Sequence, residues 1–129
     1  MADGALIGNA PAIKRGRVAH TDGSETVVTG AEITLPSTEG YYVLRAFAAG
    51  GSATATNKYA LGVVAGVFVN EGAANVGESV QLGTSRTGYT AAITVSGLTA
   101  RLSVTAANGV YSAGFIECLE GVELAITPA

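Results

Sequence analysis

The sequence predicts an all-β protein, an antiparallel β-sandwich or jelly-roll of about eight strands, and three observations support this fold class. Short segments rich in Val, Ile, Thr, Tyr and Phe recur along the chain. Turn residues separate these segments roughly every 8 to 12 positions, a spacing typical of sandwiches and barrels. No stretch shows the apolar period that predicts a good helix. A length of 129 residues fits one domain with a core of its own.

The first segment, residues 1–13, has neither a helix nor a strand period, and it contains Gly, Asn and Pro. It is therefore predicted to be an extended N-terminal arm, followed by a single β-sandwich domain over residues 14–129. The strands expected in that domain are 17–20, 25–35, 40–48, 58–70, 79–83, 89–96, 98–106, 110–120 and 122–127.

The clearest alternation lies in the predicted strands 89–96 and 98–106. One face of the first carries Tyr89, Ala91, Ile93 and Val95, and the second alternates apolar residues with Thr, Arg and Ser. This pattern predicts one packed face and one wet face. Ser96-Gly97 and Asn108-Gly109 supply the residues that tight hairpin turns favour. The expected structure is three consecutive antiparallel strands over residues 89–120.

The predicted strand 110–120 differs, because both of its faces are partly apolar. Tyr111 and Phe115 share one face with Ala113, whereas Val110, Ile116 and Cys118 occupy the other. Such a strand either lies in the centre of a sandwich or packs outward on another subunit. Tyr111 and Phe115 are therefore predicted to lie at a subunit interface. The run from Leu61 to Val69 has the same two-sided character.

Composition points to a component of an assembly. Charged residues make up only 13% of the chain and apolar residues 48%, whereas ordinary soluble domains are about 25% charged. A mean hydropathy of +0.39 without a membrane-spanning segment predicts that neighbouring subunits cover some apolar surface. The formal charge of −3 argues against nucleic acid as a partner. No secretory signal is evident at the N-terminus, so synthesis in the cytoplasm is expected.

No catalytic group is predicted. His20, Asp22 and Ser24 have the residue types of a hydrolase triad, but all three lie within five positions around an Asp-Gly turn. A triad needs a scaffold that places the His between nucleophile and carboxylate. Asp22 and Ser24 are better explained by hydrogen bonds to their own backbone. The chain is accordingly expected not to be an enzyme.

No metal or other cofactor is predicted either. Glu117, Glu120 and Glu123 lack the spacing of a calcium loop and are interpreted as a solvated strand edge or an intersubunit salt bridge. The segment 83–88 lacks the lysine of a phosphate-binding loop. Cys118 is the single cysteine, so no internal disulfide exists, and it is expected to be a small buried hydrophobic residue.

Two further groups could bind a partner. Lys14, Arg15 and Arg17 hold three of the seven basic residues and are predicted either to dock on an acidic protein surface or to form a solvated patch. Tyrosines offer a flat apolar face with a polar tip, which suits a sugar-binding groove, although strand tyrosines more often lie at a core rim or an interface. The five tyrosines are Tyr41, Tyr42, Tyr59, Tyr89 and Tyr111.

Three segments together resemble small β-sandwich structural proteins of tailed-bacteriophage virions. They are ITLPSTEGYYVLRAFAAGG (33–51), KYALGVVAGVFV (58–69) and YTAAITVSGLTARLSVTAANGVYSAGFIEC (89–118), about two-thirds of the chain. Proteins of that kind are non-enzymatic, commonly form trimers, and serve as capsid decoration or as tail and fibre modules. The chain departs from the pattern at Tyr111, where a tryptophan often stands, and it lacks a fibrous stalk.

The resemblance implies a capsid decoration or cement protein that stabilises the phage head. In that reading it is a homotrimer, made in the host cytoplasm and bound to the major capsid protein or another virion protein on the capsid exterior, with the arm at 1–13 as an anchor. The alternative is a tail-tip or fibre module that binds a host receptor or glycan. Neither reading involves a membrane or nucleic acid.

Overall fold

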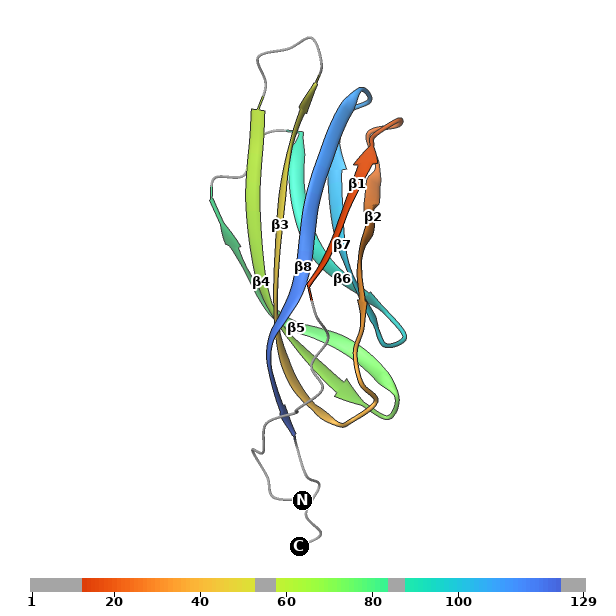
Figure 1. Ribbon diagram of the computed structural model, residues 1–129, viewed down its shortest axis with the longest axis vertical. Helices are drawn as coiled ribbons and strands as arrows, with labels where there is room; N and C mark the ends of the chain where they lie inside the picture. The colour runs from red at the N-terminus through yellow and green to blue at the C-terminus, as the bar shows by residue number, and fades with distance from the viewer. Residues whose placement is uncertain (1–12, 53–57, 84–87, 124–129) are drawn as a thin grey trace, which may run out of the picture.

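The computed structural model of the chain describes residues 13–52, 58–83 and 88–123 (Figure 1). In this part the protein is all-β, as predicted, and none of it forms a helix long and apolar enough to cross a membrane. Apart from Ile13, the predicted arm lies outside the described residues. The eight strands seen are β1 (Lys14–Ala19), β2 (Glu25–Thr34), β3 (Gly40–Ser52), β4 (Lys58–Asn70), β5 (Ala73–Leu82), β6 (Tyr89–Ser96), β7 (Thr99–Ala106) and β8 (Val110–Glu123).

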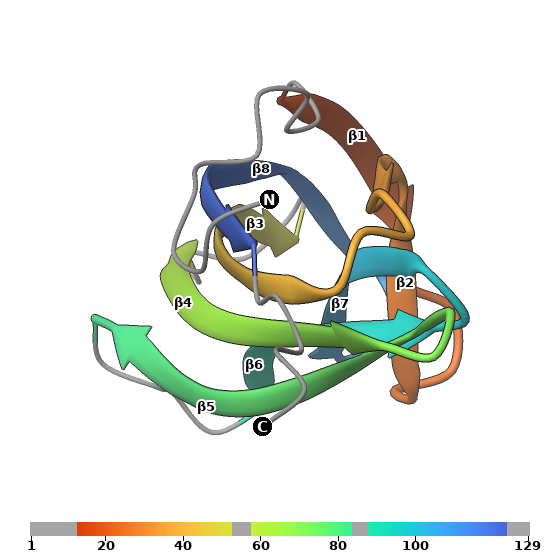
Figure 2. The same ribbon diagram turned by 90° about the horizontal axis from the view of Figure 1, so that it is seen from below.

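The strands form one antiparallel sheet with the order β5-β4-β3-β8-β1-β2-β7-β6. Viewed along its length, this sheet curls around a central interior (Figure 2). The two edge strands approach each other, and the Ala74 amide donates to the Gly97 carbonyl at 2.7 Å. The predicted sandwich or jelly-roll is therefore not confirmed, because the strands make a nearly closed barrel rather than two stacked sheets.

The predicted hairpin at Ser96-Gly97 is confirmed, but the one at Asn108-Gly109 is wrong. β6 pairs with β7 from Tyr89 opposite Ala106 to Ser96 opposite Thr99. β7 and β8 are not neighbours in the sheet, because β2 occupies the other edge of β7. Gly109 does have a positive φ of 88°, yet its amide donates to the His20 carbonyl at 2.9 Å, at the end of β1.

β8 lies between β3 and β1 and is the central strand of one wall of the barrel. It pairs with β3 from Ser52 opposite Val110 to Gly40 opposite Glu123, and with β1 from Lys14 opposite Ile116 to Ala19 opposite Tyr111. The sequence predicted separate strands at 110–120 and 122–127, but β8 is continuous to Glu123. A register shift between Val43 and Leu44 accommodates one extra β8 residue there.

The core is filled mainly by alternate residues of β2, β3, β4, β6, β7 and β8. Burying one such aliphatic or aromatic side chain contributes about 1.5–3 kcal/mol. Along β3 every second residue is buried and the residues between are exposed. The large side chains that are fully buried include Ile33, Leu35, Tyr42, Leu44, Leu61, Tyr89, Leu102 and Ile116.

Two glycines allow the wall strands to approach closely. Gly16 of β1 lies opposite Gly114 of β8 in the register. A Cβ on Gly114 would lie 2.7 Å from the Leu102 side chain and would also collide with the Phe47 carbonyl. A Cβ on Gly16 would collide with the backbone of Thr29. Both positions therefore require the absence of a side chain.

The Gly114→Ala substitution is expected to lower the free energy of unfolding by about 2 kcal/mol or more, because the added methyl overpacks the interior. Gly66→Ala is the matched control, since it also lies in a strand but a Cβ there meets nothing within 4 Å. Urea unfolding of both variants measures the difference, and equal stability of the two would show that the close approach at Gly114 is not a constraint.

Candidate functional site

The β1–β8 pairing brings two groups of predicted site residues onto one surface. Arg15 lies opposite Phe115, Arg17 lies opposite Ala113, and Ala19 lies opposite Tyr111. Lys14 is exposed too, but it lies opposite the buried Ile116 and so on the other face of the strand. Two of the three predicted basic docking residues, Arg15 and Arg17, are therefore neighbours of the predicted interface residues Tyr111 and Phe115. Their separate roles in docking and subunit contact stay predictions.

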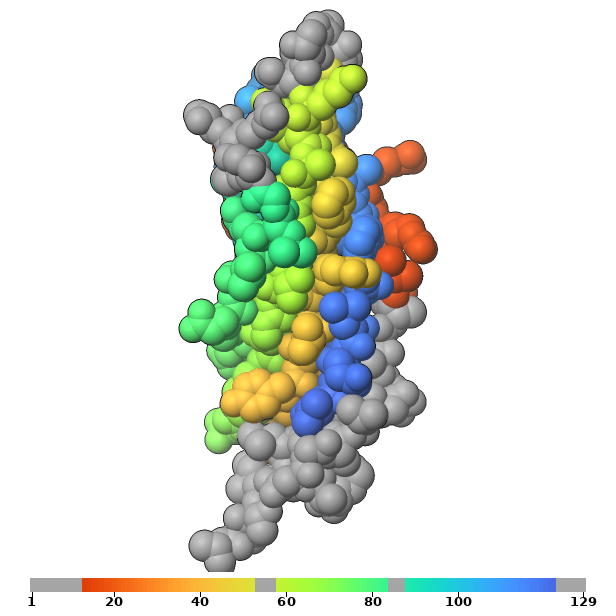
Figure 3. All heavy atoms as spheres, turned by 90° about the vertical axis from the view of Figure 1, so that its left-hand side faces the viewer, coloured from red at the N-terminus to blue at the C-terminus, as the bar shows by residue number. Residues whose placement is uncertain are grey.

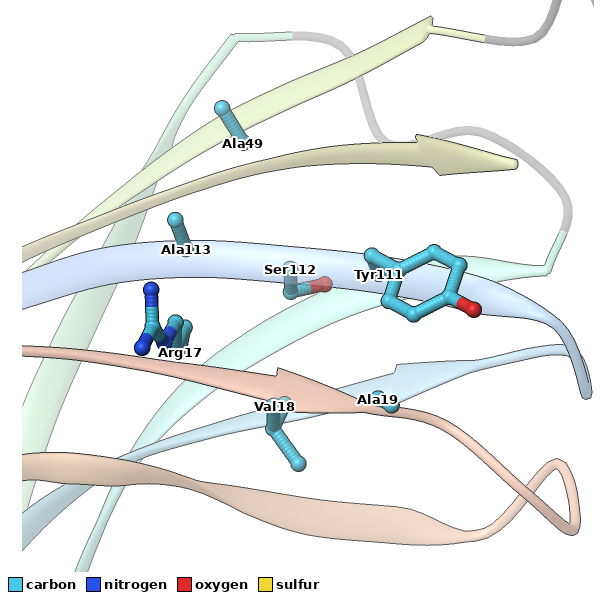
Figure 4. A pocket seen from close by; sticks show the side chains of 7 residues that line it. All are labelled: Arg17, Val18, Ala19, Ala49, Tyr111, Ser112 and Ala113. Atoms are coloured by element: carbon cyan, nitrogen blue, oxygen red, sulfur yellow. The ribbon is translucent and has the colours of Figure 1, made fainter. Parts of the chain in front are cut away.

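A pocket of about 500 Å³ opens on this surface at the end of the barrel where β8 begins. Its lining comes from β1, β3 and β8: Arg17, Val18, Ala19, Ala49, Tyr111, Ser112 and Ala113. Figure 4 shows the Arg17 guanidinium over the β1–β8 seam near Ala113, with the Tyr111 ring farther along β8. The pocket thus has a cation near one end, a phenol near the other and small side chains between them.

An outer apolar face covers β5, β4, β3 and the adjoining part of β8 (Figure 3). Tyr41 contacts Phe68 with ring centroids 4.9 Å apart, and Phe47 stacks on Phe115 at 6.4 Å. Arg45 and Glu117, which lie opposite each other within this face, form an ion pair. The outer apolar face consists of eight outward-facing residues: Tyr41, Val43, Phe47, Val64, Phe68, Val80, Leu82 and Phe115.

Inside the barrel, a polar network lies beneath the pocket. The ring of His20, only 2% exposed, is hydrogen-bonded through Nε2 to the Ser112 hydroxyl at 2.9 Å. The same hydroxyl is hydrogen-bonded to the Tyr89 hydroxyl at 2.9 Å, and the Tyr89 ring stacks on Tyr59 at 4.6 Å. These contacts join β1, β8, β6 and β4 at one end of the barrel. The Ser112 hydroxyl is therefore already engaged and faces the interior.

Burial determines the protonation of the His20 ring. Removal from water lowers the pKa of His20, and the carboxylate of Asp22 opposes this only in part. Nδ1 has no hydrogen-bond partner among the described residues. The ring is therefore neutral at neutral pH. Burial also raises the pKa of Tyr89, so its hydroxyl stays protonated.

His20, Asp22 and Ser24 do not come together as a triad. The Asp22 carboxylate accepts hydrogen bonds from the Ser24 amide at 3.0 Å and the Ser24 hydroxyl at 2.6 Å. These bonds hold the pKa of Asp22 below its ordinary value. His20 instead points to Ser112, a residue that the sequence did not single out. The interpretation of Asp22 and Ser24 as turn residues is confirmed.

The predicted carboxylate row also separates in the structure. Glu117 pairs with Arg45 in the same chain, while Glu120 is exposed one bulge farther along β8. Over the described ranges, no three His, Cys, Asp or Glu side chains are grouped as metal ligands. Cys118 is half-buried rather than fully buried; its thiol donates to the Glu120 carbonyl at 3.4 Å, and burial raises the thiol pKa.

The five tyrosines divide between core and surface and do not form one groove. Tyr42 and Tyr89 are fully buried, and Tyr59 stacks on Tyr89 within the barrel. Tyr41 and Tyr111 are 55% and 58% exposed, at opposite ends of the β3–β8 pair. The sugar-binding groove of clustered tyrosines considered from the sequence is therefore not present in the described residues, and only Tyr111 lines the pocket.

Comparison with known proteins identifies the fold but no family. No protein-family model matches the sequence, and no curated protein matches it either. A crystal structure of the tailspike protein of Acinetobacter phage vB_ApiP_P1 shares the fold over 94% of this chain, with a TM-score of 0.52 and 17% identity. The tailspike of Acinetobacter baumannii phage AM24 aligns over 92% with a TM-score of 0.41 and 17% identity. The chain spans about a quarter of each tailspike, 24% and 26%.

The stability of the protein is expected to fall as the pH drops below about 6.5, the ordinary histidine pKa. The folded state holds the pKa of His20 below that value, so the unfolded chain binds more protons between the two pKa values and acid favours unfolding. The full contribution of neutral His20 is present above about pH 6.5.

Urea unfolding between pH 7 and pH 5 measures this dependence, with His20→Gln as the comparison. The variant should show a shallower loss of stability over this interval, because glutamine does not titrate. Identical slopes for the two proteins would contradict the assignment of a buried neutral ring.

Proposed function

We propose that the chain is a non-enzymatic structural module of a tailed-phage tail that assembles with copies of itself and contacts the host surface. The observation that carries the structural role is the outer apolar face. In this face Val80 is 61% exposed and Leu82 49%, and Tyr41, Val43 and Phe47 are exposed as well. Contiguous apolar surface on a soluble chain marks a site of protein contact.

A second copy of the chain is the proposed occupant of the outer apolar face. Arg45 and Glu117 neutralise each other within the chain, so this pair presents no net charge to an apolar partner, whereas Glu120, opposite Val43, is exposed at the margin of the face. The chain as a whole is only 13% charged. Homo-oligomers with closed symmetry are the most common soluble assemblies, and a homotrimer is the form that the phage resemblance implies.

The tailspike likeness supports a place in the tail rather than on the capsid exterior. The fold alignment covers nearly all of this chain and one part of a longer tailspike. That relation fits a module of a tail protein, so the alternative expected from the sequence, a tail-associated module with a receptor or glycan contact, is favoured over capsid decoration. Its partners are then other copies of itself, neighbouring tail proteins and a host-surface ligand.

The self-assembly part of the proposal predicts that Val80→Glu weakens the oligomer. A charge in the outer apolar face loses its hydration when the face is covered, so the dissociation constant should rise at least about tenfold, equivalent to about 1.4 kcal/mol. Sedimentation velocity over a range of concentrations measures it. Thr29→Glu is the control, because Thr29 is exposed on β2, which β1 and β8 separate from β3 in the sheet. A monomeric wild-type protein, or an unchanged oligomer in Val80→Glu, would contradict the proposal.

The place in the virion can be tested by immunogold labelling. Antibodies against the folded protein should place gold at the tail of virions of the phage that carries the chain. Labelling distributed over the head would contradict the tail assignment and would instead support a capsid decoration protein. Pre-incubation of the antibody with purified protein should abolish the labelling and so controls for specificity.

A further inference from the structure

The pocket over the β1–β8 seam combines three features that recognition of a small molecule needs. Its volume of about 500 Å³ lies within the range of small-molecule sites, about 300–1,000 Å³. It holds one guanidinium, from Arg17, and one exposed aromatic ring, from Tyr111. The residues that flank these two groups are small: Ala113 and Ala49 lie across the strands from Arg17, and Ala19 lies opposite Tyr111 (Figure 4).

The strand segments that line the pocket carry Arg15 and Arg17 and no carboxylate, although the chain carries −3 overall; the carboxylate of Asp22 follows β1 and acts on His20 beneath the pocket. Carboxylates are absent from β1, β3 and β4 and from β8 before Glu117. Glu117 is itself paired with Arg45. Arg15, Arg17 and Lys58 form no ion pair within the described part of the chain. A local excess of positive charge attracts an anionic ligand and raises its association rate.

The arrangement of Arg17 and Tyr111 selects the kind of anion. A guanidinium binds a carboxylate through two parallel hydrogen bonds. A tyrosine ring offers an apolar face with a hydroxyl at its tip, which suits a ring that is apolar on one side and polar at its rim. The register places Tyr111 two residues along β8 from Ala113, the partner of Arg17, a separation of roughly 7 Å. One ligand ring can therefore contact both groups.

We propose that this pocket binds a carboxylate-bearing sugar unit of an anionic polysaccharide. Arg17 binds the carboxylate and Tyr111 packs against the sugar ring. The small alanine side chains beside these two residues leave room for the ring. This inference rests on the proposed contact with the host surface and names the chemical class of its ligand. It assigns Tyr111 to a ligand rather than to a subunit interface.

The strands beneath the pocket are fixed before any ligand binds. Below Tyr111 and Ala113, Ser112 is hydrogen-bonded inside the barrel to His20 and Tyr89. Gly16 packs against the backbone of β2, and Gly114 packs against β3 and the Leu102 side chain. A pocket on rigid strands loses little conformational entropy on binding, which favours affinity for a single sugar unit.

The test is an NMR titration of isotope-labelled full-length protein with glucuronate, galacturonate and N-acetylneuraminate. At least one acid should cause saturable shifts centred on Arg17, Tyr111 and Ala113. D-glucose, which lacks the carboxylate, should bind at least about tenfold more weakly, and inorganic phosphate should not reproduce the pattern. Absence of saturable binding for every acid, or equal binding of glucose or phosphate, would overturn the proposal.

Variants connect the shifts to the proposed residues. Arg17→Gln and Tyr111→Ala should each weaken binding at least about tenfold. Arg15→Gln removes the same charge from the neighbouring outward-facing residue of β1 and should weaken binding less. Equal losses in Arg15→Gln and Arg17→Gln would show attraction by charge alone and overturn the assignment.

Sedimentation velocity on the same samples separates this proposal from the self-assembly proposal. Arg17→Gln and Tyr111→Ala should leave the oligomeric state unchanged, because neither residue belongs to the outer apolar face. A changed oligomeric state in these variants would make the pocket a subunit contact and overturn the sugar assignment. Failure of Val80→Glu to alter the oligomer would instead count against self-assembly while leaving the sugar titration unaffected.

Discussion

The pairing of β8 with β3 on one edge and β1 on the other is the constraint on which the rest of the structure depends. It joins the N-terminal strand to the last strand of the described chain and so turns a row of hairpins into a nearly closed barrel. It also fixes Arg17 opposite Ala113. Loss of this pairing would separate the basic strand from the aromatic one, and the pocket between them would be lost.

Most strand positions were predictable from the sequence, whereas their pairing was not. Alternation and turn residues depend on near neighbours, and they placed β6, β7 and the turn at Ser96-Gly97 correctly. Asn108-Gly109 gives an equally strong local turn signal, yet it joins strands that are not neighbours. Which strands pair is decided by distant parts of the chain, since β2 pairs with the free edge of β7 and β1 pairs with the free edge of β8. The Arg17–Tyr111 pocket joins positions 94 residues apart in the chain, so no local pattern could reveal it.

The two faces of the wall strands differ in their surroundings, since one is buried in the barrel and the other is exposed. Inward residues fill the barrel and form the His20–Ser112–Tyr89 network, which joins four strands at one end. Several outward residues of β3 and β5 are apolar, and among the described residues Val43, Phe47 and Val80 stay exposed. The apolar character of both faces of β8 was visible in the sequence. Its inward face belongs to the core, and its outward face is the one that the proposed self-assembly would cover.

Hydroxyl-radical footprinting of the assembled protein tests most directly whether this wall is divided into a covered face and an open pocket. Labelling is compared between the wild-type oligomer and the Val80→Glu protein at the same concentration. Phe47 and Leu82 should be protected in the oligomer and labelled in the variant, while Tyr111 should be labelled equally in both. Equal labelling of Phe47 and Leu82 in the two proteins, or protection of Tyr111 in the oligomer, would contradict this division of the surface.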